Sequence, residues 1–242
     1  MKRLALVCAV VLLTACAKRP DYRVTAEHRQ INNRAAIVVL QDPEARLQFV
    51  AQQPTRSTQA RAVVEGLDAN ADIRRFLGPR LKGKGLTVVP FEYDPQAFAR
   101  VYGSSMAFAA PGQVRDELCA QAGAQQVDML VAVYRQAAKD IVEGSVENLV
   151  GYGLVRHELT GQVHAYANIS LEALTTKSCT LVGNSDASRS QPVEASLWQA
   201  GFDTDRARLE LAGEAAVALR KSITPVLLDA VMSAAQEAGL SN

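Results

Sequence analysis

The chain has 242 residues, of which 48% are hydrophobic and 21% are charged, and its formal net charge is +1. This composition is typical of one globular domain and excludes an intrinsically disordered chain. The near-neutral charge excludes the electropositive footprint of a nucleic-acid-binding protein, and an aromatic content of 5% disfavours base-stacking sites. We therefore expect no nucleic acid among its partners.

The N-terminal segment has the three parts of an export signal. Lys2 and Arg3 give it a positive start, and residues 4–13 form an apolar run. That run is too short to span a bilayer, which needs roughly 20 apolar residues. The small residues Thr14 and Ala15 then supply a cleavage site. The pattern predicts a signal peptide over residues 1–15, whose removal takes Lys2 and Arg3 away and changes the formal charge from +1 to −1.

The sequence Leu13-Thr14-Ala15-Cys16 resembles the lipobox of bacterial lipoproteins, an aliphatic residue and two small residues before an invariant cysteine. The resemblance implies that Cys16 becomes the N-terminus, carries diacylglycerol and is acylated by a fatty acid such as palmitate. Two or more acyl chains anchor a protein stably. In that family an aspartate after the cysteine retains the protein in the inner membrane, so Ala17 implies the periplasmic face of the outer membrane. An ordinary secretory signal with a coincident cysteine is the alternative.

Residues 16–33 are polar and lack periodicity, which predicts a lipidated tether followed by a single domain over 34–242. Once Cys8 leaves with the signal and Cys16 carries lipid, Cys119 and Cys179 are the remaining thiols. In an oxidising compartment we expect them to form a disulfide. Two separate buried cysteines that pack as small apolar groups are the alternative.

The first half of the domain predicts short strands and one helix. Ile73, Leu77 and Leu81 recur on one helical face, while Gly78-Pro79 predicts a kink or a restart within that helix. The expected elements are strands over 35–40, 47–50 and 86–89, a loop over 54–60 and a helix over 70–81. Residues 94–110 show only weak helical character.

The middle of the chain predicts a helix that leads into a central strand. Val114, Leu118 and Ala122 share one stripe of a helix that starts at Pro111-Gly112. In the next strand, over 127–134, both alternating sets of side chains are apolar from Met129 onward. A strand with two apolar faces is covered on both sides, so it is expected in the middle of a sheet.

The last part of the chain predicts a long hairpin and closing helices. Residues 162–173 alternate apolar and polar side chains, which is typical of a half-buried antiparallel strand. A turn over 175–178 leads to a return strand over 179–182, with a weaker, polar continuation over 183–191. Asp203, Thr204 and Asp205 offer helix-capping chemistry for a segment that runs to Gly239, and Pro225 is expected to divide it in two.

This order of elements predicts an α/β fold with a mixed parallel and antiparallel sheet packed against helices. The order, with Ala122-Gly123-Ala124 leading into the strand over 127–133, resembles an envelope module found in the N-terminal domain of TolB, in CsgG and in LpoB. The resemblance covers about residues 36–239 and rests on pattern. The YajG-like lipoproteins are similar in element order. The chain lacks the amphipathic hairpin insertions that CsgG uses to build a pore, and no partner carries over.

The candidate chemistry does not assemble into a catalytic site. His157 and His164 flank a possible turn at Thr160-Gly161, but Glu158 and Asp140 are the only nearby ligand candidates, and His28 lies in the tether. The remaining motifs lack the context of a known site: Gly151-Tyr152-Gly153, interpreted as a turn or bulge; Ser104-Ser105, without an assigned base; and Lys139-Asp140, interpreted as a solvated strand end. We expect a non-enzymatic protein with no metal and no cofactor.

The segment 144–153 is the candidate contact surface, because it joins two strong strands and carries Val146, Leu149, Val150 and Tyr152. The alternative is a loop folded back onto its own core. Trp198 poses a similar choice between a core anchor and an interface hot spot. We expect a membrane-anchored module that binds another envelope protein or itself. The alternatives are a lipid or small-molecule carrier of a transport system and, third, an envelope hydrolase.

Overall fold

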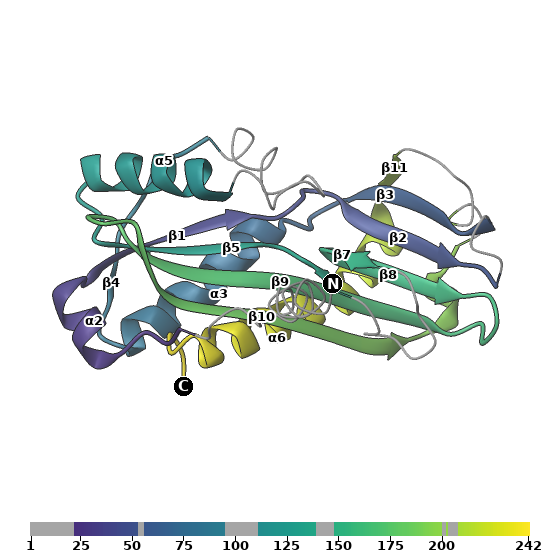
Figure 1. The fold of residues 1–242 in the computed structure, drawn as a ribbon. Helices are drawn as coiled ribbons and strands as arrows, with labels where there is room; N and C mark the ends of the chain where they lie inside the picture. Colours follow the sequence, from purple (N-terminus) through teal and green to yellow (C-terminus); the bar gives the residue numbers. More distant parts are fainter. Residues whose placement is uncertain (1–21, 53–55, 95–110, 139–147, 200–201, 203–207) are drawn as a thin grey trace, which may run out of the picture.

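The computed structural model describes residues 22–52, 56–94, 111–138, 148–199, 202 and 208–242, and it is a mixed α/β fold (Figure 1). Its strands are β1 (Arg34–Leu40), β2 (Ala45–Val50), β3 (Thr58–Val64), β4 (Thr87–Val88), β5 (Met129–Arg135), β6 (Ala137–Ala138), β7 (Leu149–Val150), β8 (Tyr152–His157), β9 (Val163–Thr175), β10 (Thr180–Val193) and β11 (Leu209–Leu211). Its helices are α2 (Ala26–Ile31), α3 (Ala69–Gly83), α5 (Pro111–Ala124) and α6 (Gly213–Glu237), with a short 3₁₀ helix, η2, at Ala195–Leu197. The predicted fold class is confirmed.

The large sheet has the order β11-β3-β2-β8-β9-β5-β1-β4, and β10 pairs with β9. β9 organises this sheet because it is long enough to carry two neighbours end to end along one edge. Residues 163–167 pair with β8 and residues 169–175 pair with β5, both antiparallel. Along its other edge β9 forms the predicted hairpin with β10. The predicted strand over 127–134 is confirmed as central, since β5 lies between β1 and β9.

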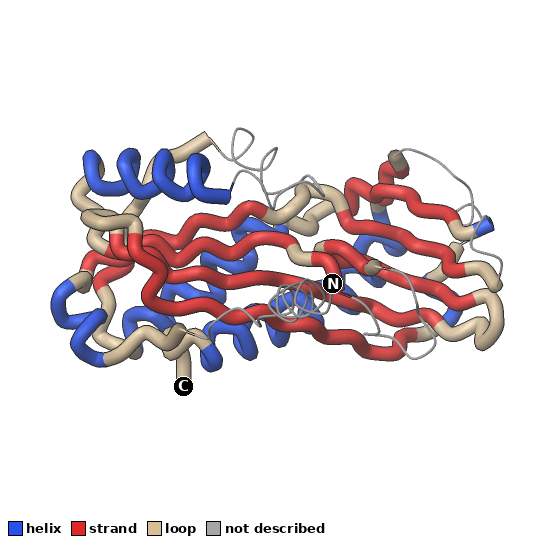
Figure 2. Tube along the Cα trace, viewed as in Figure 1, coloured by secondary structure: helices blue, strands red, loops and turns tan. Residues whose placement is uncertain are grey.

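One face of the sheet is covered by α3 and α6, which lie behind the strands in Figure 2. This face holds the main apolar core, in which Leu47, Val131, Ile169 and Leu227 are fully buried. Burial of apolar surface is the dominant favourable term in folding. The long helix α6 and the long β9–β10 hairpin therefore both contribute to this main core.

The opposite face of the sheet is covered by fewer elements and holds two smaller apolar clusters. Helix α5 packs Leu118 and Ala122 onto Val38 and Leu130 near one end of the sheet. Farther along, Val50, Leu149, Val155 and Tyr166 form a separate small cluster. The side chain of Val114, predicted on the α5 stripe, lies outside the described residues.

Two predictions about proline are corrected. α3 continues through Pro79 to Gly83, and α6 continues through Pro225 to Glu237, so neither helix restarts there. Burial of Leu77 and Leu81 in α3, and of Ile223 and Leu227 in α6, places apolar side chains on both sides of each proline. Tertiary packing of these flanking turns outweighs the local cost of about 3 kcal/mol. The helix expected from residue 203 also begins later, at Gly213, after β11.

Several strand boundaries also differ from the predictions. The expected loop over 54–60 ends where β3 begins at Thr58, and β8 was not predicted. β9 was expected to be half-buried, yet all but one of its thirteen residues are buried. Its polar set is covered because Tyr166 packs in the small cluster and Glu172 pairs with α5. The predicted alternation of apolar and polar residues is present in β9, but its polar face is covered by other elements and does not face solvent.

Part of the predicted tether over residues 16–33 lies within the described residues. From Tyr22 onward the chain packs against the domain, and Val24 is buried beside the end of α6. Thr25 caps α2, because its side chain accepts the His28 backbone N–H at 3.2 Å while His28 Nδ1 accepts the Thr25 N–H at 3.3 Å. His28 is therefore a capping residue.

Among the described helices, none is long and apolar enough to cross a membrane.

Candidate functional site

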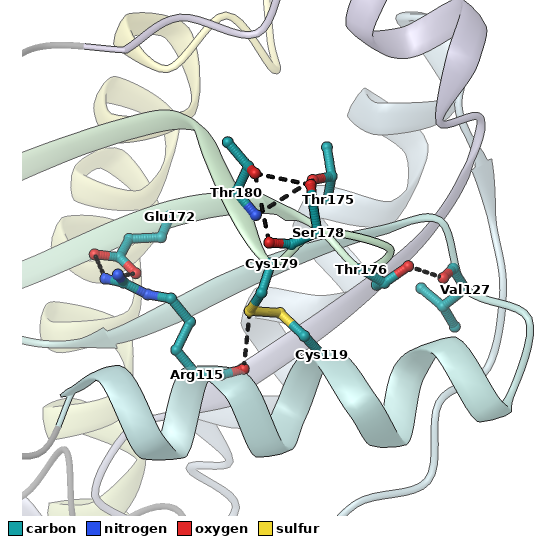
Figure 3. Close-up of a disulfide and its surroundings, with 9 residues drawn as sticks. All are labelled: Arg115, Cys119, Val127, Glu172, Thr175, Thr176, Ser178, Cys179 and Thr180. Atoms are coloured by element: carbon teal, nitrogen blue, oxygen red, sulfur yellow. Dashed lines mark hydrogen bonds and ion pairs between the residues drawn. A yellow bond between two sulfur atoms is a disulfide. The ribbon is translucent and has the colours of Figure 1, made fainter.

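A disulfide fastens α5 to the turn of the long hairpin (Figure 3). Cys119 lies on α5, Cys179 is the last residue of the turn before β10, and their Cα atoms are 5.6 Å apart. The predicted pairing is thus present in the structure. The bond closes a sequence separation of 60 residues, which in the chain-entropy account corresponds to about 4 kcal/mol of stabilisation.

The buried carboxylate of Glu172 makes a second attachment of α5. Glu172 is 1% exposed, and Arg115 Nη2 donates to both of its oxygens at 3.1 and 3.0 Å. Tyr134 Oη donates to the same carboxylate at 2.9 Å. A buried charge is tolerated only when it is paired and hydrogen-bonded. These contacts use the carboxylate to hold α5 on β9, which is a structural role.

A second ionic cluster lies where β1 ends and β2 begins. The carboxylate of Asp42 accepts from Arg46 at 3.1 Å and also from Arg135. Tyr152 Oη donates to the Asp42 carbonyl at 2.7 Å. Burial, followed by the nearby charges of Asp42 and two other carboxylates, raises the pKa of Tyr152, so its hydroxyl remains a donor. The cluster joins the two halves of the sheet.

The described part of the segment predicted as a contact surface, residues 148–153, is folded back into this structure. Leu149 and Tyr152 are 0% and 1% exposed, and Val150 is half-buried. Val146 lies outside the described residues. Gly153 is required by a close approach, since a Cβ there would lie 1.8 Å from the Arg46 carbonyl oxygen. Leu149 and Tyr152 are therefore core residues. They fit the alternative interpretation of a loop folded back onto its own core.

Three other residues singled out in the sequence, Trp198, His157 and His164, lie within the described part of the chain. Trp198 is 8% exposed, and its ring packs edge-on against that of Phe202 with 5.5 Å between the ring centroids. This is the packing of a core residue. His157 is buried, and burial lowers the pKa of the half-buried His164. The described residues contain no group of three or more metal-ligating side chains. Ser104, Ser105, Lys139 and Asp140 lie outside the described residues.

The outer edge of β10 carries backbone groups that point away from β9. Asn168 directs both backbone groups away from β10, because its N–H donates to Gly151 O at 2.7 Å and its carbonyl accepts from Gln136 at 3.1 Å. Ser188 is the partner of Asn168 in the β9–β10 register. In an antiparallel ladder such a pair is not hydrogen-bonded to each other. The backbone groups of Ser188, and by alternation those of Asp186, therefore point outward.

The ends of this edge are defined by two residues. At one end Asn184 already pairs with the entering chain, donating its N–H to Tyr22 O at 3.0 Å and accepting the Tyr22 N–H on Oδ1 at 2.8 Å. At the other end Pro192 has no N–H to offer. Among the described strands, β9 is the one that pairs with β10. Between these two ends lie Asp186 and Ser188, whose backbone groups point away from β9.

A shallow hollow lies at the end of the hairpin, between the β8–β9 turn and the end of β10. Its volume is about 220 Å³, and it is lined by Thr160, Gly161, Gln162, Val163, Pro192, Val193 and Ala195. Pockets for drug-sized ligands are usually about 300–1,000 Å³ and mostly enclosed. This hollow gives little support to the carrier alternative.

The edge was missed by sequence reasoning, although it left a signal. The run from Gly183 to Gln191 is polar and was interpreted only as a weak continuation of the return strand. Its alternate residues Asn184, Asp186 and Ser188 are polar, and polar or charged side chains are one way in which proteins protect an edge strand from unwanted pairing. By contrast, Arg115 meets Glu172, and Arg135 meets Asp42, only through the tertiary fold.

No family model matches the chain, and no curated protein matches it. Solved structures with a related arrangement include a dodecamer of PelC from Paraburkholderia phytofirmans, which is 8% identical and covers 86% of this chain and 95% of that one at a TM-score of 0.29. A DUF330 protein from Xanthomonas campestris is 8% identical, with 82% and 81% covered and a TM-score of 0.39. A lipoprotein from Neisseria meningitidis is 12% identical, with 65% and 83% covered and a TM-score of 0.32. At TM-scores this low the likeness carries no argument about function.

Proposed function

We propose that this chain is a lipid-anchored, non-enzymatic protein of the outer membrane that binds an extended segment of another envelope protein along β10. Lipidation at Cys16 rests on the lipobox, and the membrane assignment rests on Ala17. The single observation that carries the binding proposal is the outward-facing backbone of Asp186 and Ser188 in β10. An open strand edge is a template for main-chain pairing with another chain.

The side chains along β10 suit the approach of another strand. Asp186 is bound on the sheet face by Ser170 at 2.5 Å, and Arg189 is bound on the helix face by Asp229 at 3.0 Å. Neither charge lies across the edge itself. Main-chain hydrogen bonds supply affinity in this binding mode, and alternate side chains supply specificity. A lipid anchor raises the effective concentration of the module near membrane partners.

A photo-crosslinking amino acid at Ser188, in the acylated protein in intact envelopes, tests the proposal. We expect a discrete crosslinked protein at Ser188 and none at Glu214, an exposed matched control at the start of α6. Ser188→Pro should abolish the crosslinks formed from Asp186, because it removes an outward N–H, whereas Ser188→Ala should preserve them. Equal crosslinking from Glu214 would contradict the proposal.

The same experiment separates the alternatives. Crosslinks to a second copy of the chain would show assembly by β10 pairing, which is the self-binding form of the proposal. A co-purifying lipid or small molecule, without any crosslinked protein, would support a carrier instead. A Cys16→Ser variant, which cannot be lipidated, should lose the crosslinks if anchoring supplies the effective concentration.

A further inference from the structure

The chain enters the domain at one end of the sheet, and this entry point is held by packing. Val24 is 3% exposed, and its N–H donates to the Ala238 carbonyl at 2.8 Å. Gly183 makes room for it, since a Cβ there would lie 2.7 Å from the Val24 side chain. Arg29 Nη1 donates to Val24 O at 3.0 Å and to Gly239 O at 3.2 Å. The position of Tyr22 is therefore set by the fold.

The distance from Tyr22 to the anchor is short. Cys16 precedes Tyr22 by six positions, which is at most about 20 Å of fully extended chain. β9 alone, with thirteen residues, spans roughly 40 Å at the usual strand rise. The anchored end must stay close to the bilayer, but chain length alone permits the domain either to stand or to lie flat. The surface chemistry must distinguish these orientations.

Basic side chains gather at the anchored end. They come from the entering chain and α2, the start of β1, the last turns of α3 and the β9–β10 turn, which lie at the same end of the ribbon in Figure 1. We call them the basic end: Arg23, Arg29, Arg34, Lys82, Lys84 and Lys177. The carboxylates there are Glu27, Glu92, Asp128, Glu237 and that of Asn242; Glu92 lies beside Gln125, and Glu237 is bound by Ser185 at 2.6 Å. Positive charge is in excess.

Two apolar side chains accompany the basic end. Tyr22 is 45% exposed, and Ile31, at the end of α2, is 70% exposed. Basic residues beside exposed apolar residues favour the interface of a lipid bilayer, where the cations meet headgroups and the apolar groups meet the acyl boundary. The combination is absent from the described residues at the opposite end, where Arg56 pairs with Glu158 at 3.6 Å beside the exposed Leu159.

We propose that the basic end is a membrane-facing surface that binds anionic phospholipid headgroups and holds the sheet upright on the bilayer. The inference rests on the lipid anchor of the proposed function, and it adds a second contact with the membrane. An upright domain places the β8–β9 turn far from the bilayer and directs the β10 edge along the membrane normal. Each basic residue near an anionic surface strengthens the attraction, so removing one should weaken binding by roughly five-fold.

Lipid quenching of fluorescent labels at the two ends tests the orientation. The full acylated protein is reconstituted in phosphatidylethanolamine vesicles containing phosphatidylglycerol, with a single dye at Ile31→Cys or, as the matched control, at Leu159→Cys. Both positions carry exposed large apolar side chains in the native protein. We expect spin-labelled lipids to quench the Ile31 dye several-fold more than the Leu159 dye. Equal quenching at both positions would overturn the proposal.

Charge-reversal variants test the lipid chemistry. Lys82→Glu combined with Lys84→Glu should reduce the quenching difference, and Lys221→Glu, at an exposed position on α6, should leave it unchanged. Replacing phosphatidylglycerol by phosphatidylcholine should reproduce the loss. A difference that survives both changes would refute headgroup binding. Because no protein partner is present, failure here leaves crosslinking at Ser188 unaffected, and mass spectrometry of the acyl group tests the anchor separately.

Discussion

The two faces of the sheet are stabilised by different means. The face under α3 and α6 holds a continuous apolar core that includes most of the buried residues of α6. The face under α5 has a smaller apolar cluster, and α5 is additionally held by the Cys119–Cys179 disulfide and the Arg115–Glu172 ion pair. Where a helix buries little apolar surface, covalent and ionic attachments supply the stability that packing supplies elsewhere.

The largest expected effect is on the α6 face. Leu227→Ala removes a fully buried side chain from the main core and should lower the free energy of unfolding by about 2–5 kcal/mol. The loss should appear as one cooperative transition in urea, monitored by circular dichroism. Val217→Ala on the same helix, at a position that is 39% exposed, should change stability by less than about 0.5 kcal/mol. Similar losses from both variants would show that α6 is not the main support.

Removal of the disulfide should act mainly on the α5 face. The Cys119→Ser, Cys179→Ser double variant should lose up to about 4 kcal/mol of unfolding free energy. Hydrogen exchange should increase first in α5, while the α6 amides stay protected, because α6 is held by packing. Treatment of the native protein with a reductant should reproduce the change. Uniform loss of protection across both helices would contradict the comparison between the faces.

Arg115→Ala should cost less, about 2–3 kcal/mol, because it leaves the Glu172 carboxylate buried without its arginine while Arg115 itself is partly exposed. Denaturant titration would measure this loss. The double variant Arg115→Met, Glu172→Leu should recover stability to within about 1 kcal/mol of the native protein, since an apolar pair can replace a buried ion pair. A double variant as unstable as Arg115→Ala would mean that the charges contribute more than attachment.

The smallest effect at neutral pH concerns one buried tyrosine on each face. Burial raises the pKa of Tyr152 and of Tyr166 above the ordinary value of 10.0. A raised pKa means that the folded state holds the proton more tightly, so this stability is fully present below about pH 10 and is lost as pH rises further. Tyr152→Phe and Tyr166→Phe should each cost about 1 kcal/mol at neutral pH. In each variant, stability should also fall less steeply as the pH rises above about 10, as measured by thermal melting at a series of pH values. The same steepness in both variants and the native protein would contradict this pH prediction.

Much of the fold was predictable because it depends on local pattern. The apolar run over 35–40, the central strand from Met129 and the alternation over 163–173 each record how their side chains are buried. The cysteine pair was predictable from the export signal. The predicted division at Pro225 and the restart alternative at Pro79 were wrong because packing of the surrounding turns outweighs a local cost, and sequence periodicity does not measure that packing.

The candidate site was predicted less well. Leu149 and Tyr152 were expected at a contact surface because apolar residues between strands resemble an exposed tip, yet both are covered by residues distant in sequence. The β10 edge was overlooked because its polar composition lowers every strand signal. Whether a strand lies at a sheet edge, and whether a residue is buried, depends on its neighbours in space. The sequence of a single segment carries little information about those neighbours.

By itself, the sequence predicted an export signal and a lipid on Cys16 from one short segment, and it predicted the α/β class and the Cys119–Cys179 pair that the structure contains. The tertiary structure alone decided that α5 is fastened to Glu172, that Tyr22 pairs with Asn184, and that the basic end forms from five separate segments. These features join residues up to 213 positions apart, as Arg23 and Gln236 show. Contacts of such range depend on how the sheet and helices pack, which local propensity does not specify.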